Sequence, residues 1–117
     1  MVFSLRLRLL SSLAAAFGLI GLAASAGDSD DVARAREGVR AGRFVPLERV
    51  VGWVAERYHG RLLEVEFEME DDDEGDVPTY EVEWLTPAGH VIEFEFDARD
   101  GALLEIEGRG IEEARRR

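Results

Sequence analysis

The hydrophobic pattern of this chain changes its period at Gly60, from 3.6 residues before that position to two residues after it. Val45 precedes a proline and is therefore biased toward an extended conformation, while Pro46 suits the first position of a helix and Gly60 suits a left-handed cap at its end. Between them, apolar side chains recur at helical spacing on one face: Leu47, Val50, Val51, Val54 and Tyr58. The pattern predicts an amphipathic helix whose apolar face is buried.

A shorter helix is expected before it, from Val32 to Ala41. Aspartates stand at its start and arginines toward its end, which suits the helix dipole, although Gly38 lowers the helix propensity. Its apolar stripe, Ala35 and Val39, is narrow. We therefore expect this helix to dock on a larger core rather than to form one.

After Gly60, apolar residues and glutamates alternate in four short segments, a pattern typical of strands with one buried and one solvated face. The apolar positions are Leu63, Val65, Phe67, Met69, Tyr80, Val82, Trp84, Ile92, Phe94, Phe96, Leu104 and Ile106. The ten glutamates are Glu64, Glu66, Glu68, Glu70, Glu81, Glu83, Glu93, Glu95, Glu105 and Glu107. We call these ten residues the acidic face and expect water to cover it.

The connections between these segments indicate antiparallel neighbours. Residues 86–89 (Thr-Pro-Ala-Gly) and 98–101 (Ala-Arg-Asp-Gly) are short and turn-forming, whereas residues 71–76 form a longer acidic loop. The apolar helix face has one obvious partner, the apolar face of the sheet. The sequence predicts an α+β fold in which a helix, preceded by a shorter helix, packs on one face of a four-stranded antiparallel β-meander.

The first 26 residues have the parts of a secretory signal peptide. Arg6 and Arg8 form a positive start, residues 9–22 are apolar, and Ala24-Ser25-Ala26 gives a small-x-small cleavage pattern. A retained membrane anchor is the alternative, but the uncharged stretch barely reaches the roughly 20 residues that a bilayer requires. We expect cleavage after Ala26 and a periplasmic or secreted protein that touches a membrane only through an uncleaved signal.

The rest of the chain is expected to divide into three parts. Residues 27–34 are predicted to be a flexible lead, residues 35–108 the folded domain, and residues 109–117 a charged C-terminal tail. The chain has no cysteine, which excludes a disulfide framework, so the domain must be held by its core.

Acidic residues dominate the charge of the chain. Its 25 Asp and Glu against 14 Lys and Arg give a formal net charge of −11, and removal of the signal takes away two arginines and no acid. Nucleic-acid binding draws its affinity from Lys and Arg that neutralise phosphates. We therefore expect no nucleic-acid partner.

Five pieces of sequence follow one another in a recognisable order. They are the helix opening Phe44-Val45-Pro46-Leu47, the passage 57–65 (Arg-Tyr-His-Gly-Arg-Leu-Leu-Glu-Val), Tyr80-Glu81-Val82, the hairpin 86–89, and the closing stretch 96–104 (Phe-Asp-Ala-Arg-Asp-Gly-Ala-Leu-Leu). From Ala35 to Ile106 this set resembles the PepSY domain family, so residues 35–108 are interpreted as a PepSY-like domain. The last piece is similar to the family's strand-Asp-Ala-x-x-Gly-x-hydrophobic turn.

The resemblance implies an exported or membrane-associated module. Such modules are found in propeptides of metallopeptidases, in membrane proteins and as small stand-alone periplasmic proteins, and peptidase inhibition or regulation has been proposed for them. The resemblance implies no catalytic residue. Since no peptidase domain follows in this sequence, we expect any target to be a separate molecule.

Side chains suited to catalysis are few. Beyond residue 26 the hydroxyl side chains other than tyrosine are Ser29, Thr79 and Thr86, and Lys, Asn, Gln and Cys do not occur. Nucleophilic catalysis needs an activated nucleophile beside a base, and paired glutamates on a flat solvated face lack the cleft that raises the pKa of one of them. We expect no catalytic residue, no cofactor and no enzyme activity.

Metal-binding patterns are also weak. His59 and His90 are the only histidines, and a zinc site needs further nitrogen or sulfur ligands. The acidic run from Asp71 does not fit an EF-hand loop, because its glycine, Gly75, is fifth rather than sixth and its twelfth position is Val82. No specific metal site is expected, although weak binding of divalent cations by the acidic residues is plausible.

These observations favour an exported, non-enzymatic module that binds a protein in the periplasm or cell envelope. A peptidase and the periplasmic part of a membrane protein are the candidate partners that it would modulate. Seven glutamates of the acidic face would attract a basic surface, and Trp53 would supply an apolar anchor. The seven are Glu64, Glu66, Glu68, Glu81, Glu83, Glu93 and Glu95. The alternative is an acidic, cation-responsive accessory protein, and an enzyme is less favoured.

Overall fold

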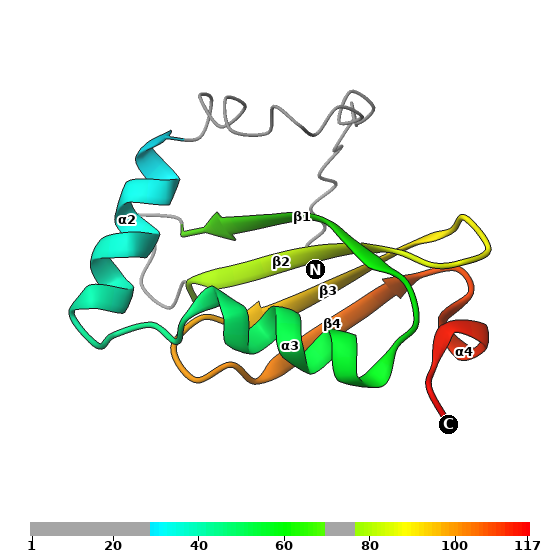
Figure 1. Cartoon of the computed structure of the whole chain (residues 1–117). Coiled ribbons are helices and arrows are strands. Elements are labelled where there is room, and N and C mark those ends of the chain that lie inside the picture. Colours follow the sequence, from blue (N-terminus) through cyan, green and yellow to red (C-terminus); the bar gives the residue numbers. More distant parts are fainter. Residues whose placement is uncertain (1–28, 70–76) are drawn as a thin grey trace.

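The computed structural model of this protein describes residues 29–69 and 77–117. In order, the elements are α2 (Ser29–Arg40), α3 (Leu47–Arg57), β1 (Arg61–Glu68), β2 (Thr79–Leu85), β3 (Val91–Asp97), β4 (Leu103–Gly108) and α4 (Ile111–Ala114). The strands form one antiparallel sheet in sequence order, and α3 lies across one side of it (Figure 1). The predicted α+β fold is confirmed. The expected signal peptide and the acidic loop 71–76 lie outside the described residues.

Helix α3 buries most of the face that its sequence pattern predicts, but Leu47 at its start is 37% exposed and Val51 is only half-buried, so the prediction is wrong for Leu47. Val50 and Val54 are fully buried, and so is Tyr58 directly after the helix. The helix ends differently from the prediction, because Tyr58 is extended and Gly60 is not its cap. Gly60 has a φ of 130°, and a Cβ there would clash with the carbonyl oxygen of Leu85. This glycine therefore lets the chain pass close to β2 as it enters the sheet.

The core lies between α3 and the sheet and is largely aromatic. The ring of Tyr58 meets that of Phe94 edge-on at 5.1 Å between centroids, and the ring of Trp53 meets that of Phe96 at 5.6 Å. Such T-shaped pairs add stability beyond the apolar area that they bury. The buried hydrophobic residues of the sheet are Phe67, Tyr80, Val82, Trp84, Ile92, Phe94 and Phe96.

Two β-bulges change which leucines face the core. The pairing of β1 with β2 skips a residue between Leu62 and Glu64, and the skipped Leu63 is 42% exposed. The pairing of β4 with β3 skips Leu104, which is 51% exposed, so Leu103 lies opposite Phe96 instead. The prediction that Leu63 and Leu104 lie in the apolar face is therefore wrong. A bulge inserts one residue into the alternation, which then changes phase.

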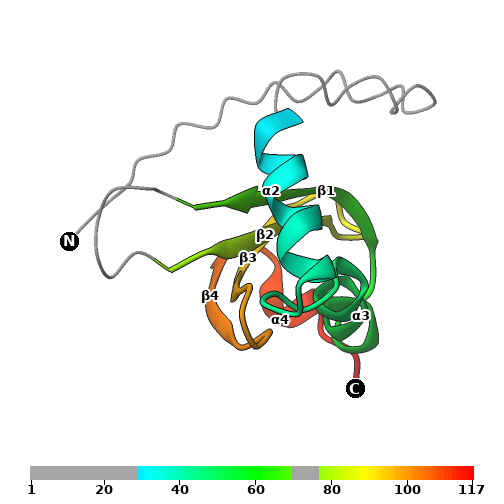
Figure 2. The same cartoon turned by 90° about the vertical axis from the view of Figure 1, so that its left-hand side faces the viewer.

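Both ends of the described domain are more ordered than expected. Helix α2 begins at Ser29, so residues 29–34 are helical rather than a flexible lead, and α2 is not shorter than α3. At the other end, residues 111–114 form α4, and Ala114 is buried. The backbone N–H of His59 donates to the carbonyl oxygen of Ala114 at 2.7 Å. The predicted charged tail is thus part of the fold, beside the end of α3 (Figure 2).

Candidate functional site

The acidic face lies on the side of the sheet opposite α3, since alternate side chains of a strand point to opposite faces. Strand register aligns its glutamates in two rows across all four strands. One row is Glu66, Glu81, Glu95 and Glu105, and the other is Glu64, Glu83, Glu93 and Glu107. The structure therefore brings the seven predicted glutamates onto one face, with Glu68 beside the first row. Glu70 lies outside the described residues.

Water does not cover this face evenly, in contrast to the prediction. Glu81, on the inner strand β2, is only 6% exposed, whereas Glu64 on the edge strand β1 is exposed. Glu105 and Glu107 on the other edge strand, β4, are also exposed, whereas five glutamates are half-buried: Glu66, Glu68, Glu83, Glu93 and Glu95. Six of the seven also take part in hydrogen bonds or electrostatic interactions: Glu64, Glu66, Glu68, Glu81, Glu83 and Glu95. Much of the face is thus partly buried and engaged in interactions, rather than a set of separate solvated groups.

Contact with other glutamates raises the pKa of Glu107 above its ordinary value. The largest cause is a hydrogen bond with the side chain of Glu105, followed by the negative charge of that residue, by burial, and by the charges of Glu93 and Glu95. A hydrogen bond between two carboxyl groups requires a proton on one of them. This end of the acidic face therefore favours a bound proton.

Three carboxylates gather at the other end of the face. Oxygen atoms of Glu66, Glu68 and Glu81 lie within 4.8 Å of one another. Hard cations prefer oxygen ligands. Strand register alone also brings these side chains together, so the cluster does not by itself define a cation site. Neither histidine belongs to a group of three possible metal ligands within residues 29–69 and 77–117.

Trp53 lies on the helix side of the sheet, away from the acidic face. Its ring packs edge-on against Phe94 and Phe96, and the guanidinium of Arg57 lies 4.3 Å from the ring centroid. The ring is consequently half-buried, so only part of it is presented to solvent. The structure does not bring Trp53 together with the seven glutamates, and a flat partner surface would not contact both.

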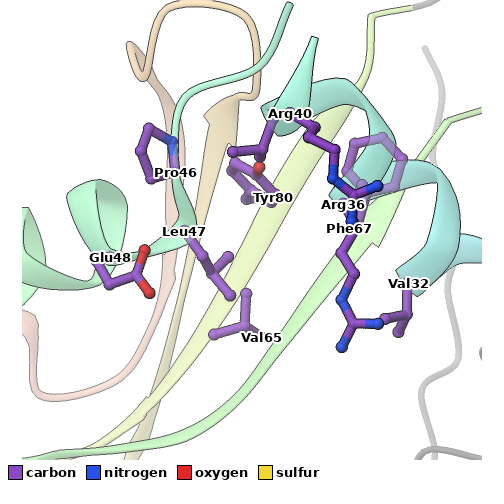
Figure 3. Close-up of a pocket in the computed structure, with 11 residues that line it drawn as sticks. Val32, Arg36, Arg40, Pro46, Leu47, Glu48, Val65, Phe67 and Tyr80 are labelled. Carbon is purple, nitrogen blue, oxygen red and sulfur yellow. The ribbon is translucent and has the colours of Figure 1, made fainter. Parts of the chain in front are cut away.

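The structure reveals a groove that the sequence analysis did not predict. It lies between α2, the start of α3 and strands β1 and β2, with a volume of about 520 Å³ (Figure 3). Its lining residues are Val32, Ala35, Arg36, Val39, Arg40, Pro46, Leu47, Glu48, Val65, Phe67 and Tyr80. We call it the α2–α3 groove. The helical spacing of Ala35 and Val39 predicts a docking stripe on α2, but periodicity within one helix does not indicate a groove between two helices.

Tyr80 forms part of the floor of this groove. Its hydroxyl donates a hydrogen bond of 2.8 Å to the carbonyl oxygen of Val45, which ties the segment before α3 to β2. Burial raises the pKa of the Tyr80 hydroxyl, and the nearby charge of Glu48 raises it further. The hydroxyl is therefore a neutral group that is already used within the fold.

These features define a small α+β module with a charged sheet face and with helices packed on the opposite face. Residues 54–107 match the family model described as "Peptidase propeptide and YPEB domain", or PepSY. The chain is therefore a PepSY-domain protein, and the resemblance found in the sequence is confirmed. The match runs from within α3 to β4, so α2 and α4 lie outside it.

PepSY domains are propeptide-like or regulatory modules rather than catalytic ones, and they occur in exported proteins. Comparison with curated proteins and with solved structures yields no match. Among the helices of residues 29–69 and 77–117, none has the length and apolar character to cross a membrane.

Proposed function

We propose that this chain is an exported, non-enzymatic PepSY module that binds a separate protein through its acidic face. The observation that carries the proposal is the pair of glutamate rows that extends across all four strands. A surface of one charge steers a complementary partner and speeds its encounter. The partner surface is therefore basic.

The proposed partner is a peptidase or the periplasmic part of a membrane protein. The family description supports the first, because it names peptidase propeptides. Trp53 supplies a second, separate contact on the helix side, and a partner that reaches both must extend around an edge of the sheet.

The direct test reverses charge on the acidic face. A partner is first captured from envelope extract, and its association rate is then measured with the triple variant Glu66→Arg, Glu83→Arg, Glu93→Arg. We expect the rate to fall by at least about tenfold at low salt, because steering depends on the sign of the surface charge. Added salt should slow the unmodified protein in the same direction.

A matched control changes the same number of charges on the helices, through Glu37→Arg, Glu56→Arg and Glu113→Arg, which are all exposed. This variant should bind nearly as fast as the unmodified protein. Equal slowing by both variants would mean that net charge, rather than the acidic face, controls the encounter. An unchanged rate in the sheet variant would exclude the acidic face as the binding surface.

A cation-responsive role is the second candidate, and the proximity of Glu66, Glu68 and Glu81 favours it. It predicts that the thermal stability rises on addition of calcium and reaches a plateau, and that a fixed number of calcium ions binds per protein molecule. The protein-binding role instead predicts a gradual rise, since calcium then acts only by screening. Calcium titration with Glu68→Gln as control separates the two roles.

A further inference from the structure

The α2–α3 groove has apolar walls on three sides. Leu47 and Val65 lie between α3 and α2 in Figure 3, with Phe67 nearer to α2, and Tyr80 also lines the groove. Its volume of about 520 Å³ is within the roughly 300–1,000 Å³ of small-molecule sites. Two of the large hydrophobic residues that line it, Val32 and Leu47, are exposed to solvent. The groove is therefore large enough, open enough and apolar enough to hold a ligand.

Charge around the groove differs in sign from charge on the acidic face. Residues 32–49, which include most of α2 and the start of α3, contain five arginines and two glutamates. Arg36 and Arg40 are four residues apart on α2 and both line the groove, while Glu48 stands on the opposite side (Figure 3). Two guanidinium groups one helical turn apart favour an anionic group on the α2 side.

These two arginines have spare hydrogen-bonding capacity. Arg36 makes no hydrogen bond or ion pair with any other residue in the described part of the chain. Arg40 pairs with Glu37 at 3.7 Å, but both side chains are well exposed, so the pair is weak. A carboxylate could therefore be bound by both guanidinium groups without the loss of a strong contact.

The groove offers few hydrogen-bonding side chains, which disfavours ligands with many polar groups. Tyr80 supplies the one neutral hydrogen-bonding side chain among the lining residues, and its hydroxyl already donates to Val45. Arg36, Arg40 and Glu48 are the other polar side chains of the lining, so a peptide bound there would leave most of its main-chain amides without a side-chain partner, and burying an unpaired amide is costly. An alkyl chain has no such groups to satisfy.

We propose that the α2–α3 groove binds an amphiphilic carboxylate of the fatty-acid type. The alkyl chain lies on Leu47, Val65 and Phe67, and the carboxylate accepts hydrogen bonds from Arg36 and Arg40. Glu48 fixes the orientation, because it repels a carboxylate from the α3 side. This site is on the helix side of the sheet and is independent of the acidic face, so either proposal can fail without the other.

The test measures the binding of dodecanoate to the protein isolated after export. The dodecanoate concentration is kept below the critical micelle concentration. Calorimetry should show one-to-one binding, and dodecanol should bind at least about tenfold more weakly because it lacks the charge that the arginines pair with. The double variant Arg36→Gln, Arg40→Gln should lose about the same factor for dodecanoate. The charge-matched control Arg109→Gln, Arg117→Gln, which is remote from the groove, should bind like the unmodified protein.

A second variant tests the apolar wall. Leu47 is exposed, so Leu47→Glu leaves the core intact while it places a negative charge in the groove, and dodecanoate binding should be lost. Three results would overturn the proposal: no binding of dodecanoate, equal weakening by the two arginine pairs, or equal binding of dodecanoate and a dodecyl ammonium ion. Tighter binding of a peptide that ends in leucine than of dodecanoate would assign the groove to a peptide carboxyl terminus instead.

Discussion

Gly60 connects the helical and the strand halves of the domain, and two features require a glycine there. Its φ of 130° lies in a region that side chains rarely adopt. The chain also passes so close to β2 that a Cβ would meet the Leu85 carbonyl and the indole nitrogen of Trp84. That nitrogen donates a hydrogen bond of 2.9 Å to the carbonyl oxygen of His59, so strain at Gly60 would disturb a bond beside it.

We predict opposite effects for two glycine-to-alanine changes. Gly60→Ala should lower the free energy of unfolding by at least about 2 kcal/mol, because it adds both backbone strain and a clash. Gly52→Ala should raise it by about 0.5–1 kcal/mol, because Gly52 lies within α3 and a Cβ there meets no other atom within 4 Å. Chemical denaturation of both variants measures the difference. Equal effects would mean that the close approach at Gly60 does not exist in solution.

At the scale of elements, α4 and the residues after it pack against the C-terminal end of α3. The backbone of Arg116 donates a hydrogen bond of 2.7 Å to the carbonyl oxygen of Arg57, and Tyr58 pairs with Arg115 in an antiparallel bridge. These bonds satisfy carbonyl groups that the end of a helix leaves without intrahelical partners. Because Ala114 is buried against this end, α4 contributes packing as well as hydrogen bonds.

We predict that Ala114→Glu lowers the free energy of unfolding by about 3 kcal/mol, because it places a charge in a buried site. The control Ala88→Glu, at an exposed position in the turn between β2 and β3, should change it by less than about 0.5 kcal/mol. Urea denaturation compares the two. A small loss for Ala114→Glu would show that α4 detaches from α3 at little cost.

At the scale of the whole molecule, two groups with opposite pKa shifts contribute to the pH dependence of stability. The pKa of Glu107 is raised above 4.5, chiefly by its hydrogen bond with Glu105. The pKa of Asp97 is lowered below 3.8, chiefly by the side-chain hydrogen bonds from Arg99, at 2.8 and 3.0 Å. The folded state therefore binds an extra proton at Glu107 and resists protonation at Asp97.

We predict that the thermal midpoint first rises and then falls as pH decreases from 7. It rises as pH falls through the raised pKa of Glu107 toward 4.5, because the folded state binds more protons than the unfolded state there. It falls below 3.8, because the stability contributed by the Asp97 carboxylate is lost as pH falls through its lowered folded-state pKa. Added salt at pH 7 should also raise the midpoint by screening the acidic face.

Two variants separate these contributions. Glu107→Gln should reduce the rise above pH 4.5, and Asp97→Asn should reduce the loss below pH 3.8 while lowering stability at neutral pH. Differential scanning calorimetry at a series of pH values measures both. A midpoint that falls steadily from neutral pH downward would mean that carboxylate repulsion does not limit stability.

The sequence by itself determined the features that depend on neighbours along the chain. The helical spacing of Val50 and Val54 predicted the buried face of α3, and the alternation of aromatic residues with glutamates predicted the acidic face of the sheet. The two predicted turns end in Gly89 and Gly101. These glycines have φ values of 92° and 80°, in the region that favours glycine. Turn chemistry and periodicity act over a few residues, so they can be read without the fold.

Only the tertiary structure decided how distant segments meet. Two bulges exposed Leu63 and Leu104, α4 docked on the end of α3, and Trp53 and the acidic face came to lie on opposite sides of the sheet. Arg36 and Arg40 border a groove because α2 packs beside the start of α3 and β1. Each outcome depends on pairing register and on contacts between residues far apart in the chain, which local periodicity does not encode.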